Sequence, residues 1–235
     1  MLAYPVSDAC PMRLVPARLT RLIVALLPAL LLAATVSVQA QDVPPVLPML
    51  PVSDPILFPG LGMDITIRNP AHAVLIEDVA RGNRLFALVT LRPDSLPDGR
   101  GNRDVFPNGT LCRLVALTRS DGRLIITARA LGKIRVEGEE FTRPYRLAKI
   151  RQVPEVDADT DLDKLHRMRL EIDELLKLVD PLVLPPMSDE ERINTVAFYL
   201  DLDLFERQDL LDRDGVSARA QALIDLLTMK LASKP

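Results

Sequence analysis

Few side chains in this sequence carry the chemistry of catalysis or metal binding. The chain of 235 residues has two histidines, His72 and His166, and two cysteines, Cys10 and Cys112. Neither histidine has another His or Cys at the spacing that a transition-metal site requires. We therefore expect two surface histidines, no metal site and no cofactor.

Cys112 is a candidate nucleophile, with His72 as its candidate base. Cys112 alternates with Leu111 and Arg113 in an expected strand, and no strained turn or oxyanion-stabilising sequence surrounds it. This pattern favours a buried structural cysteine and a protein that is not an enzyme. A minor hydrolase that uses Cys112, or a barrel that holds a small ligand, is the alternative.

A series of alternating aspartates resembles a calcium-binding loop. Such a loop needs Gly at its sixth position and Glu at its twelfth, where this sequence has Leu162 and Met168. We therefore interpret the series as an acidic helix start that faces the helix dipole. Its members are Asp157, Asp159, Asp161 and Asp163.

An apolar segment bounded by prolines is the best candidate for contact with another molecule. Exposed apolar patches commonly mark binding sites. The candidate binding residues are Ile56, Leu57, Phe58 and Pro59, which precede a Pro-Gly turn at Gly60. The alternative is a loop that folds over its own barrel.

Composition indicates a globular protein with an aliphatic core. The chain is 48% hydrophobic and 26% charged, with 4% aromatic residues and no Trp. The formal net charge is −3, and no basic stripe is interleaved with aromatic residues. These features exclude an electrostatic nucleic-acid surface.

The first 40 residues have the pattern of an export signal. Arg13, Arg18 and Arg21 precede an apolar run over 22–38, and a small-residue cleavage site ends at Ala40. We expect cleavage there and an exported protein, either periplasmic or secreted. The alternative is an uncleaved segment, which is the one way in which we expect the chain to contact a membrane.

Residues 41–154 alternate with the period of β-strands. One helix is inserted, with Asn69 as N-cap, Pro70 at its first position and Val74, Leu75 and Val79 as its apolar stripe. A polar stretch over 93–107 is typical of a surface loop. The sequence predicts a small, strongly bent antiparallel sheet or barrel. Its expected strands cover 63–67, 84–91, 110–118, 123–130, 133–137 and 145–153, with Leu111, Arg113, Val115 and Leu117 on one face.

Residues 155–235 change to the helical period. Apolar residues from Leu162 to Val179 lie on one face of a helix. Ser188 and Glu191 form a capping box for a second helix. A short helix over 203–211 and a fourth over 217–231 complete the pattern. The whole mature chain is therefore expected to be an α+β protein, a β-barrel-like domain followed by a C-terminal helical bundle.

Several motifs in order resemble one known family. The opening Leu47-Pro48-Met49-Leu50-Pro51 is followed by Phe58-Pro59-Gly60, then by Gly109-Thr110, and then by Gly132 and Arg135 near the end of a hairpin. The helices from Asn194 onward also fit. This order is similar to that of the N-terminal, substrate-binding domain of Lon proteases, over about residues 46–231.

The resemblance implies a PUA-like barrel with adjoining helices that bind unfolded or flexible polypeptide clients or a partner protein. It also implies neighbours that this sequence does not contain. The phosphate-binding pattern G-x-x-x-x-G-K-[ST] of an ATPase does not occur. We therefore expect a stand-alone, non-catalytic binding module, or alternatively a structural subunit of an envelope complex.

Overall fold

The computed structural model of the chain describes residues 43–120, 122–155 and 160–233. The expected export signal, residues 1–40, lies outside these ranges, as do Asp157 and Asp159 of the aspartate series. None of the helices in the described ranges combines the length and the apolar character that crossing a membrane would need.

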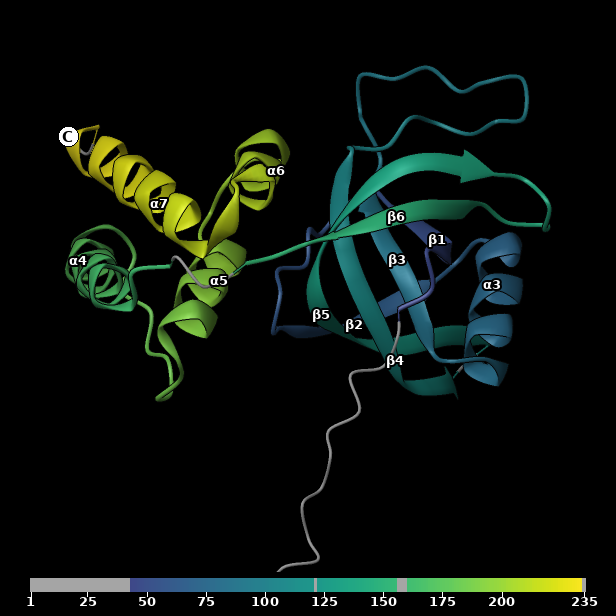
Figure 1. Ribbon diagram of the computed structural model, residues 1–235, viewed down its shortest axis with the longest axis horizontal. Helices are drawn as coiled ribbons and strands as arrows, with labels where there is room; N and C mark the ends of the chain where they lie inside the picture. Colours follow the sequence, from purple (N-terminus) through teal and green to yellow (C-terminus); the bar gives the residue numbers. More distant parts are fainter. Residues whose placement is uncertain (1–42, 121, 156–159, 234–235) are drawn as a thin grey trace, which may run out of the picture. The chain divides into compact units, whose positions relative to one another are not determined.

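Six strands form the first half of the described chain (Figure 1). The sheet order is β2-β5-β4-β3-β1-β6, and β5 also pairs with β6, which closes the sheet into a nearly complete ring. The α+β expectation is therefore confirmed. In chain order the strands are β1 (Val46–Val52), β2 (Gly62–Ile67), β3 (Leu85–Thr90), β4 (Asn108–Ser120), β5 (Arg123–Glu140) and β6 (Leu147–Val153).

One pairing corrects the expectation of an antiparallel sheet. β1 and β3 run parallel, with Met49 opposite Ala87 and Val52 opposite Thr90. Between them the chain passes through β2 and the helix α3 (Pro70–Arg81), a connection long enough to return it in the same direction. The sheet is therefore mixed.

The long hairpin of β4 and β5 differs from the sequence prediction in two ways. The two strands expected over 123–130 and 133–137 are one continuous strand, β5. Register shifts in the β4–β5 pairing, one of them between Leu114 and Ala116, break the expected alternation. As a result Leu111 is buried, whereas Val115 is 52% exposed.

The inserted helix α3 packs on the ring through a face shifted from the expected one. Asn69 caps it, because its side chain accepts the backbone N–H of Ala71. Leu75, Ile76 and Val79 are buried, and Val74 is 40% exposed. The expected stripe was therefore wrong by one position, at Val74.

Four further helices form the second half, as the sequence predicts. Ser188 and Glu191 complete the predicted capping box at the start of the second of them. The helices are α4 (Leu162–Val179), α5 (Asp189–Tyr199), α6 (Leu204–Asp212) and α7 (Gly215–Ala232).

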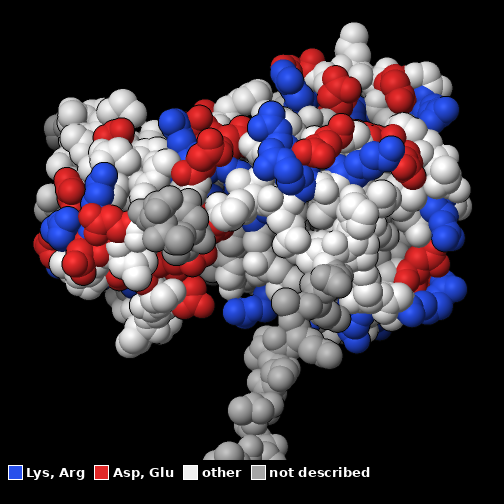
Figure 2. Space-filling view, viewed as in Figure 1, with Lys and Arg blue, Asp and Glu red and all other residues white. Residues whose placement is uncertain are grey.

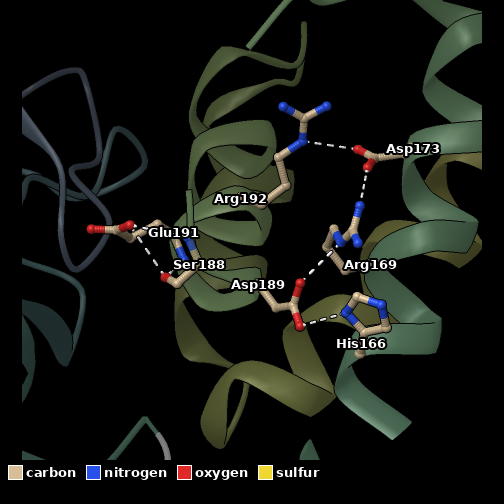
Figure 3. Close-up of polar contacts among 7 residues, drawn as sticks. All are labelled: His166, Arg169, Asp173, Ser188, Asp189, Glu191 and Arg192. Carbon is tan, nitrogen blue, oxygen red and sulfur yellow. Dashed lines mark hydrogen bonds and ion pairs between the residues drawn. The ribbon is translucent and has the colours of Figure 1, made fainter. Parts of the chain in front are cut away.

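Ion pairs connect α4 to α5 (Figure 3). Asp189 accepts from Arg169 Nε at 3.0 Å and lies 2.9 Å from His166 Nδ1. Asp173 accepts from Arg169 at 2.7 Å and from Arg192 Nε at 2.9 Å. These partly buried pairs fix the two helices side by side, and they place His166 in a structural contact.

The core of the described residues falls into three apolar clusters, two in the sheet half and one among the helices. Leu50, Leu75, Phe86 and Ile126 belong to the apolar cluster between the sheet and α3. A second cluster is formed by the inward faces of α4 to α7 and by Ile56 and Phe58. The segment between β1 and β2 therefore contributes side chains to both halves.

Candidate functional site

The apolar segment between β1 and β2 is buried. Ile56 and Phe58 are 2% and 0% exposed and pack among the helices, while Leu57 is 1% exposed and packs inside the ring. Pro59 is also buried. The expectation of an exposed contact is corrected here, because these side chains fill space between sheet and helices. That they bind polypeptide stays a prediction, which requires the segment to open.

Polar contacts hold the same segment from both sides. The hydroxyl of Thr110 on β4 donates to the carbonyl oxygen of Leu57. From α5, Asn194 Nδ2 donates to the carbonyl oxygen of Pro59 at 3.1 Å. The backbone of the segment is thus bonded to both halves, as buried carbonyl groups require.

A buried arginine lies behind the segment. Arg219 of α7 is 0% exposed and pairs with Glu155 at 2.8 Å. It also donates to Asn194 Oδ1 at 2.6 Å and to the Leu210 carbonyl at 2.9 Å. Its guanidinium carbon lies 5.4 Å from the ring centroid of Phe58, within cation–π range. The guanidinium group of Arg219 therefore has its ionic, hydrogen-bonding and aromatic partners inside the protein.

A second buried cation joins the sheet to α6. Lys133 of β5 is 2% exposed, and its Nζ donates to the carbonyl oxygens of Asp212 and Arg213 at 2.9 and 2.6 Å. Burial is the main cause of the lowered pKa of Lys133. The carbonyls at a helix C-terminus favour a cation, so this contact is structural.

No hydrogen bond joins the two candidate catalytic groups, Cys112 and His72, in the described part of the chain. Cys112 is fully buried and unpaired, and burial raises the pKa of its thiol far above the usual range. His72 lies on α3 with a lowered pKa, caused first by burial and then by the positive charge of Arg146. Within the described ranges, no three His, Cys, Asp or Glu side chains could hold a metal ion.

The described part of the aspartate series fits the helix-start interpretation. The side chain of Asp161 accepts the backbone N–H of Lys164 and caps α4, and Asp163 lies in its first turn. On the face drawn in Figure 2, basic and acidic side chains are interspersed, without a continuous basic surface.

The sheet has a groove where its ring is incomplete. The groove has a volume of about 450 Å³ and lies between the end of β1 and residues 63–67 of β2. Apolar side chains of both strands line it: Leu50, Val52, Met63, Ile65 and Ile67. Its rim is polar and includes Asp54, Asp64, Thr66, Arg68 and His72.

Pairing elsewhere in the sheet explains why the groove exists. The first part of β1 pairs with β6 up to Pro48, whereas its last part pairs only with β3. β2 pairs with β5 over Gly62–Ile67 and stands at the end of the sheet order. One edge of β2 therefore faces the end of β1 across the groove, with no described strand between them.

Sequence reasoning missed both the groove and the buried arginine. The groove depends on which strands pair, and β2 shows as a signal only its alternation of Met63, Ile65 and Ile67 with polar residues. Arg219 stands four residues before Leu223 and eight before Leu227, on the inward face of α7. A charged residue in such an apolar stripe was the signal for a buried ion pair.

These features define an α+β protein built from a nearly closed mixed sheet with a lateral groove, joined to four helices by a buried apolar segment. A comparison with protein-family models shows which family the chain belongs to. Residues 46–229 match the model of the ATP-dependent protease La (LON) substrate-binding domain, and the chain belongs to this family. The resemblance noted from the sequence motifs is thereby confirmed.

The curated relatives are named Lon proteases. A Lon protease of Dictyoglomus thermophilum is 27% identical over 206 residues, which cover 82% of this chain and 25% of the relative. Lon protease 2 of Myxococcus xanthus is 26% identical over 204 residues, covering 82% and 24%. The chain thus spans about a quarter of the length of these relatives.

Two solved structures share the fold. A Lon N-terminal domain protein from Xanthomonas campestris has a TM-score of 0.57 and 19% identity, covering 81% of this chain and 99% of that one. The N-terminal domain of a Mycobacterium avium complex Lon protease has a TM-score of 0.60 and 17% identity, covering 78% and 98%.

Proposed function

We propose that this chain is an exported, non-catalytic module that binds unfolded or flexible polypeptide. The observation that carries the proposal is the match of a substrate-binding domain family over residues 46–229. The buried, high-pKa thiol of Cys112 supports a function without nucleophilic catalysis, because a thiol is reactive only as an exposed thiolate.

The binding function is tested with an unfolded client. The protein is purified after expression from its full gene and mixed with a reduced, aggregating model protein, and light scattering follows aggregation. A client binder slows aggregation in proportion to its concentration. An unrelated folded protein of similar size and charge is the control. If the chain slows aggregation no more than this control and retains no client in pull-down, client binding fails.

Crosslinking in the native compartment distinguishes general from dedicated binding. Many heterogeneous adducts support a general client binder. One sharp adduct supports a dedicated partner and the role of a structural subunit or adaptor. The distinction matters because the curated relatives carry their matching region within a much longer protein.

Export is the second part of the proposal. It is supported by the basic residues before the apolar run over 22–38 and by the small-residue site at Ala40. An N-terminus at Gln41 in the purified protein, found in the periplasm or the medium, is the expected result. A chain that keeps residues 1–40 and sediments with membranes would instead support the anchored alternative.

A further inference from the structure

β2 has a free edge whose backbone groups can be assigned from its pairing with β5. The N–H of Ala130 donates to the Leu61 carbonyl at 2.8 Å, just before β2 begins. Because hydrogen bonding in an antiparallel pair alternates along a strand, Met63, Ile65 and Ile67 bond to β5. The backbone N–H and C=O groups of Gly62, Asp64 and Thr66 therefore point away from β5.

The outward groups of Asp64 and Thr66 face the groove between β1 and β2, because both residues line it. No other described strand pairs with this edge. Proteins usually protect such edges with proline, with bulges or by covering them. β2 contains no proline, and its register with β5 is continuous.

The opposite wall of the groove is protected in that way. Pro51 of β1 lines the groove and has no N–H to donate, a position where proline is tolerated because it is an edge. The wall formed by β1 therefore offers a strand little beyond carbonyl oxygens. A strand entering the groove would take its main-chain hydrogen bonds chiefly from β2.

Side chains around the groove fit the alternation of an extended chain. Met63, Ile65 and Ile67 turn toward the apolar interior, whereas Asp64 and Thr66 are exposed. A strand paired with β2 would place alternate side chains over the same apolar interior and the others in solvent. The shape of the groove thus matches a peptide of alternating apolar and polar residues.

Charged residues on the rim of the groove predict which charges a strand bound beside β2 would carry. Asp64 faces solvent and uses one carboxylate oxygen to accept from the Thr127 hydroxyl at 2.7 Å, and Arg68 is exposed four residues further along the same face. Cross-strand neighbours of opposite charge are favourable. The complementary strand therefore carries a basic residue opposite Asp64 and an acidic or neutral one opposite Arg68.

From this edge, groove and charge pattern, we propose that β2 binds an extended polypeptide segment by strand addition, with alternate apolar side chains entering the groove and a basic residue beside Asp64. The inference rests on the proposed polypeptide-binding function and assigns it a site. Main-chain bonding supplies affinity for many sequences, and the alternation supplies selectivity.

The test uses the chain as purified and a labelled, capped peptide of about seven residues that alternates valine with lysine or threonine. Fluorescence anisotropy gives its Kd. Thr66→Pro removes an outward N–H and places the proline ring at the edge of β2, while the hydrogen bonds between β2 and β5 stay intact. Thr66→Val keeps the N–H and is the matched control. We expect Thr66→Pro to weaken binding at least about tenfold, because one main-chain hydrogen bond is lost and the proline ring blocks the approach of the strand. We expect Thr66→Val to bind as the wild type does.

A second measurement needs no change in the protein. In antiparallel addition to β2, the polar residues of the peptide stand opposite Asp64 and Thr66 and turn their amides toward β2, while the amides of the apolar residues face away. Peptides are N-methylated at one of these two sets. Methylation of the β2-facing set is expected to abolish binding, and methylation of the other set to have a smaller effect. Equal effects, or equal binding by Thr66→Pro and wild type, would overturn strand addition at β2.

The outcomes separate this proposal from the proposed function. If Thr66→Pro still slows aggregation of the unfolded client as wild type does, the edge proposal fails and client binding stands. If wild type binds neither client nor peptide, both fail. If wild type is a dimer in analytical ultracentrifugation, Thr66→Pro is a monomer and no peptide binds, the occupant of the edge is a second copy of this chain, and the proposal is overturned.

Discussion

The guanidinium carbon of Arg219 lies 5.4 Å from the ring centroid of Phe58, and both side chains are 0% exposed. One residue belongs to the last helix and the other to the segment between the first two strands. Their contact therefore connects a segment near the beginning of the described chain with its last helix. It also places a permanent positive charge in the apolar junction of sheet and helices, where Glu155 balances it.

Replacement of Phe58 tests whether the apolar segment is structural. Phe58→Ala would leave a cavity among the helices and is expected to lower the free energy of unfolding by about 3–5 kcal/mol. Phe141→Ala is the control, because Phe141 is 44% exposed and should cost less than about 1 kcal/mol. Urea denaturation monitored by circular dichroism measures both. A Phe58→Ala cost no greater than that of the control would mean that the segment is not packed as described.

The ion pair of Arg219 and Glu155 predicts a non-additive pattern. Glu155→Leu leaves a buried, uncompensated guanidinium and is expected to destabilise by about 3–5 kcal/mol. The double variant Glu155→Leu with Arg219→Met removes both charges and should recover much of that loss, because the desolvation cost of the pair disappears as well. A double-mutant cycle in urea measures the coupling. Strict additivity of the two changes would contradict a direct interaction.

Gly109 and Gly132 stand in the motifs that suggested the family, and the structure distinguishes them. A Cβ at Gly109 would lie 2.6 Å from the Leu88 carbonyl oxygen and 2.8 Å from Val89 Cγ1, whereas a Cβ at Gly132 would meet nothing within 4 Å. Gly109→Ala must therefore push β3 away from β4 and is expected to cost about 1–3 kcal/mol.

Gly132→Ala is the matched control, expected to change stability by less than about 1 kcal/mol in either direction. Thermal unfolding of the two variants beside wild type gives the comparison. Equal losses for both would show that strand pairing, and not close backbone approach, accounts for glycine at position 109.

Local pattern predicted most elements of the fold but not their connections. The capping box at Ser188 and the apolar stripe of α4 depend on neighbours within a few residues, so the sequence indicates them directly. The parallel pairing of Met49 with Ala87 and the burial of Phe58 depend on residues far apart in the chain. The groove beside β2 depends on the same long-range pairing, and periodicity alone does not reveal it.

Burial of Cys112 predicts an unreactive thiol. In a Cys10→Ser background, Cys112 is the only thiol in the chain, and a maleimide should label it slowly in the native state and rapidly in urea. The rate of labelling in the native state should therefore be limited by unfolding of the protein. Rapid native labelling would instead support the alternative of a cysteine-dependent hydrolase. Mass spectrometry of timed samples measures the rates.

The histidine at the groove gives stability a pH dependence with a definite sign. The pKa of His72 in the folded protein lies below 6.5, first because it is partly buried and then because Arg146 carries a positive charge nearby. The unfolded chain therefore binds this proton at higher pH than the folded chain does. As the pH falls through about 6.5 toward the folded pKa, the unfolded state gains protons first, and the contribution of His72 to stability is lost.

His72→Gln removes this titration and keeps a polar side chain of similar length at the groove, which Asp64 and Arg68 also line. We expect wild type to lose more unfolding free energy than His72→Gln when the pH is lowered from about 7.5 to about 5. Urea denaturation at a series of pH values measures the unfolding free energy of both proteins. The carboxylates are common to both, so their contribution cancels in the difference. An NMR titration of the imidazole of His72 supplies the folded pKa directly. A folded pKa at or above 6.5, or parallel stability profiles, would mean that the groove does not bury this ring.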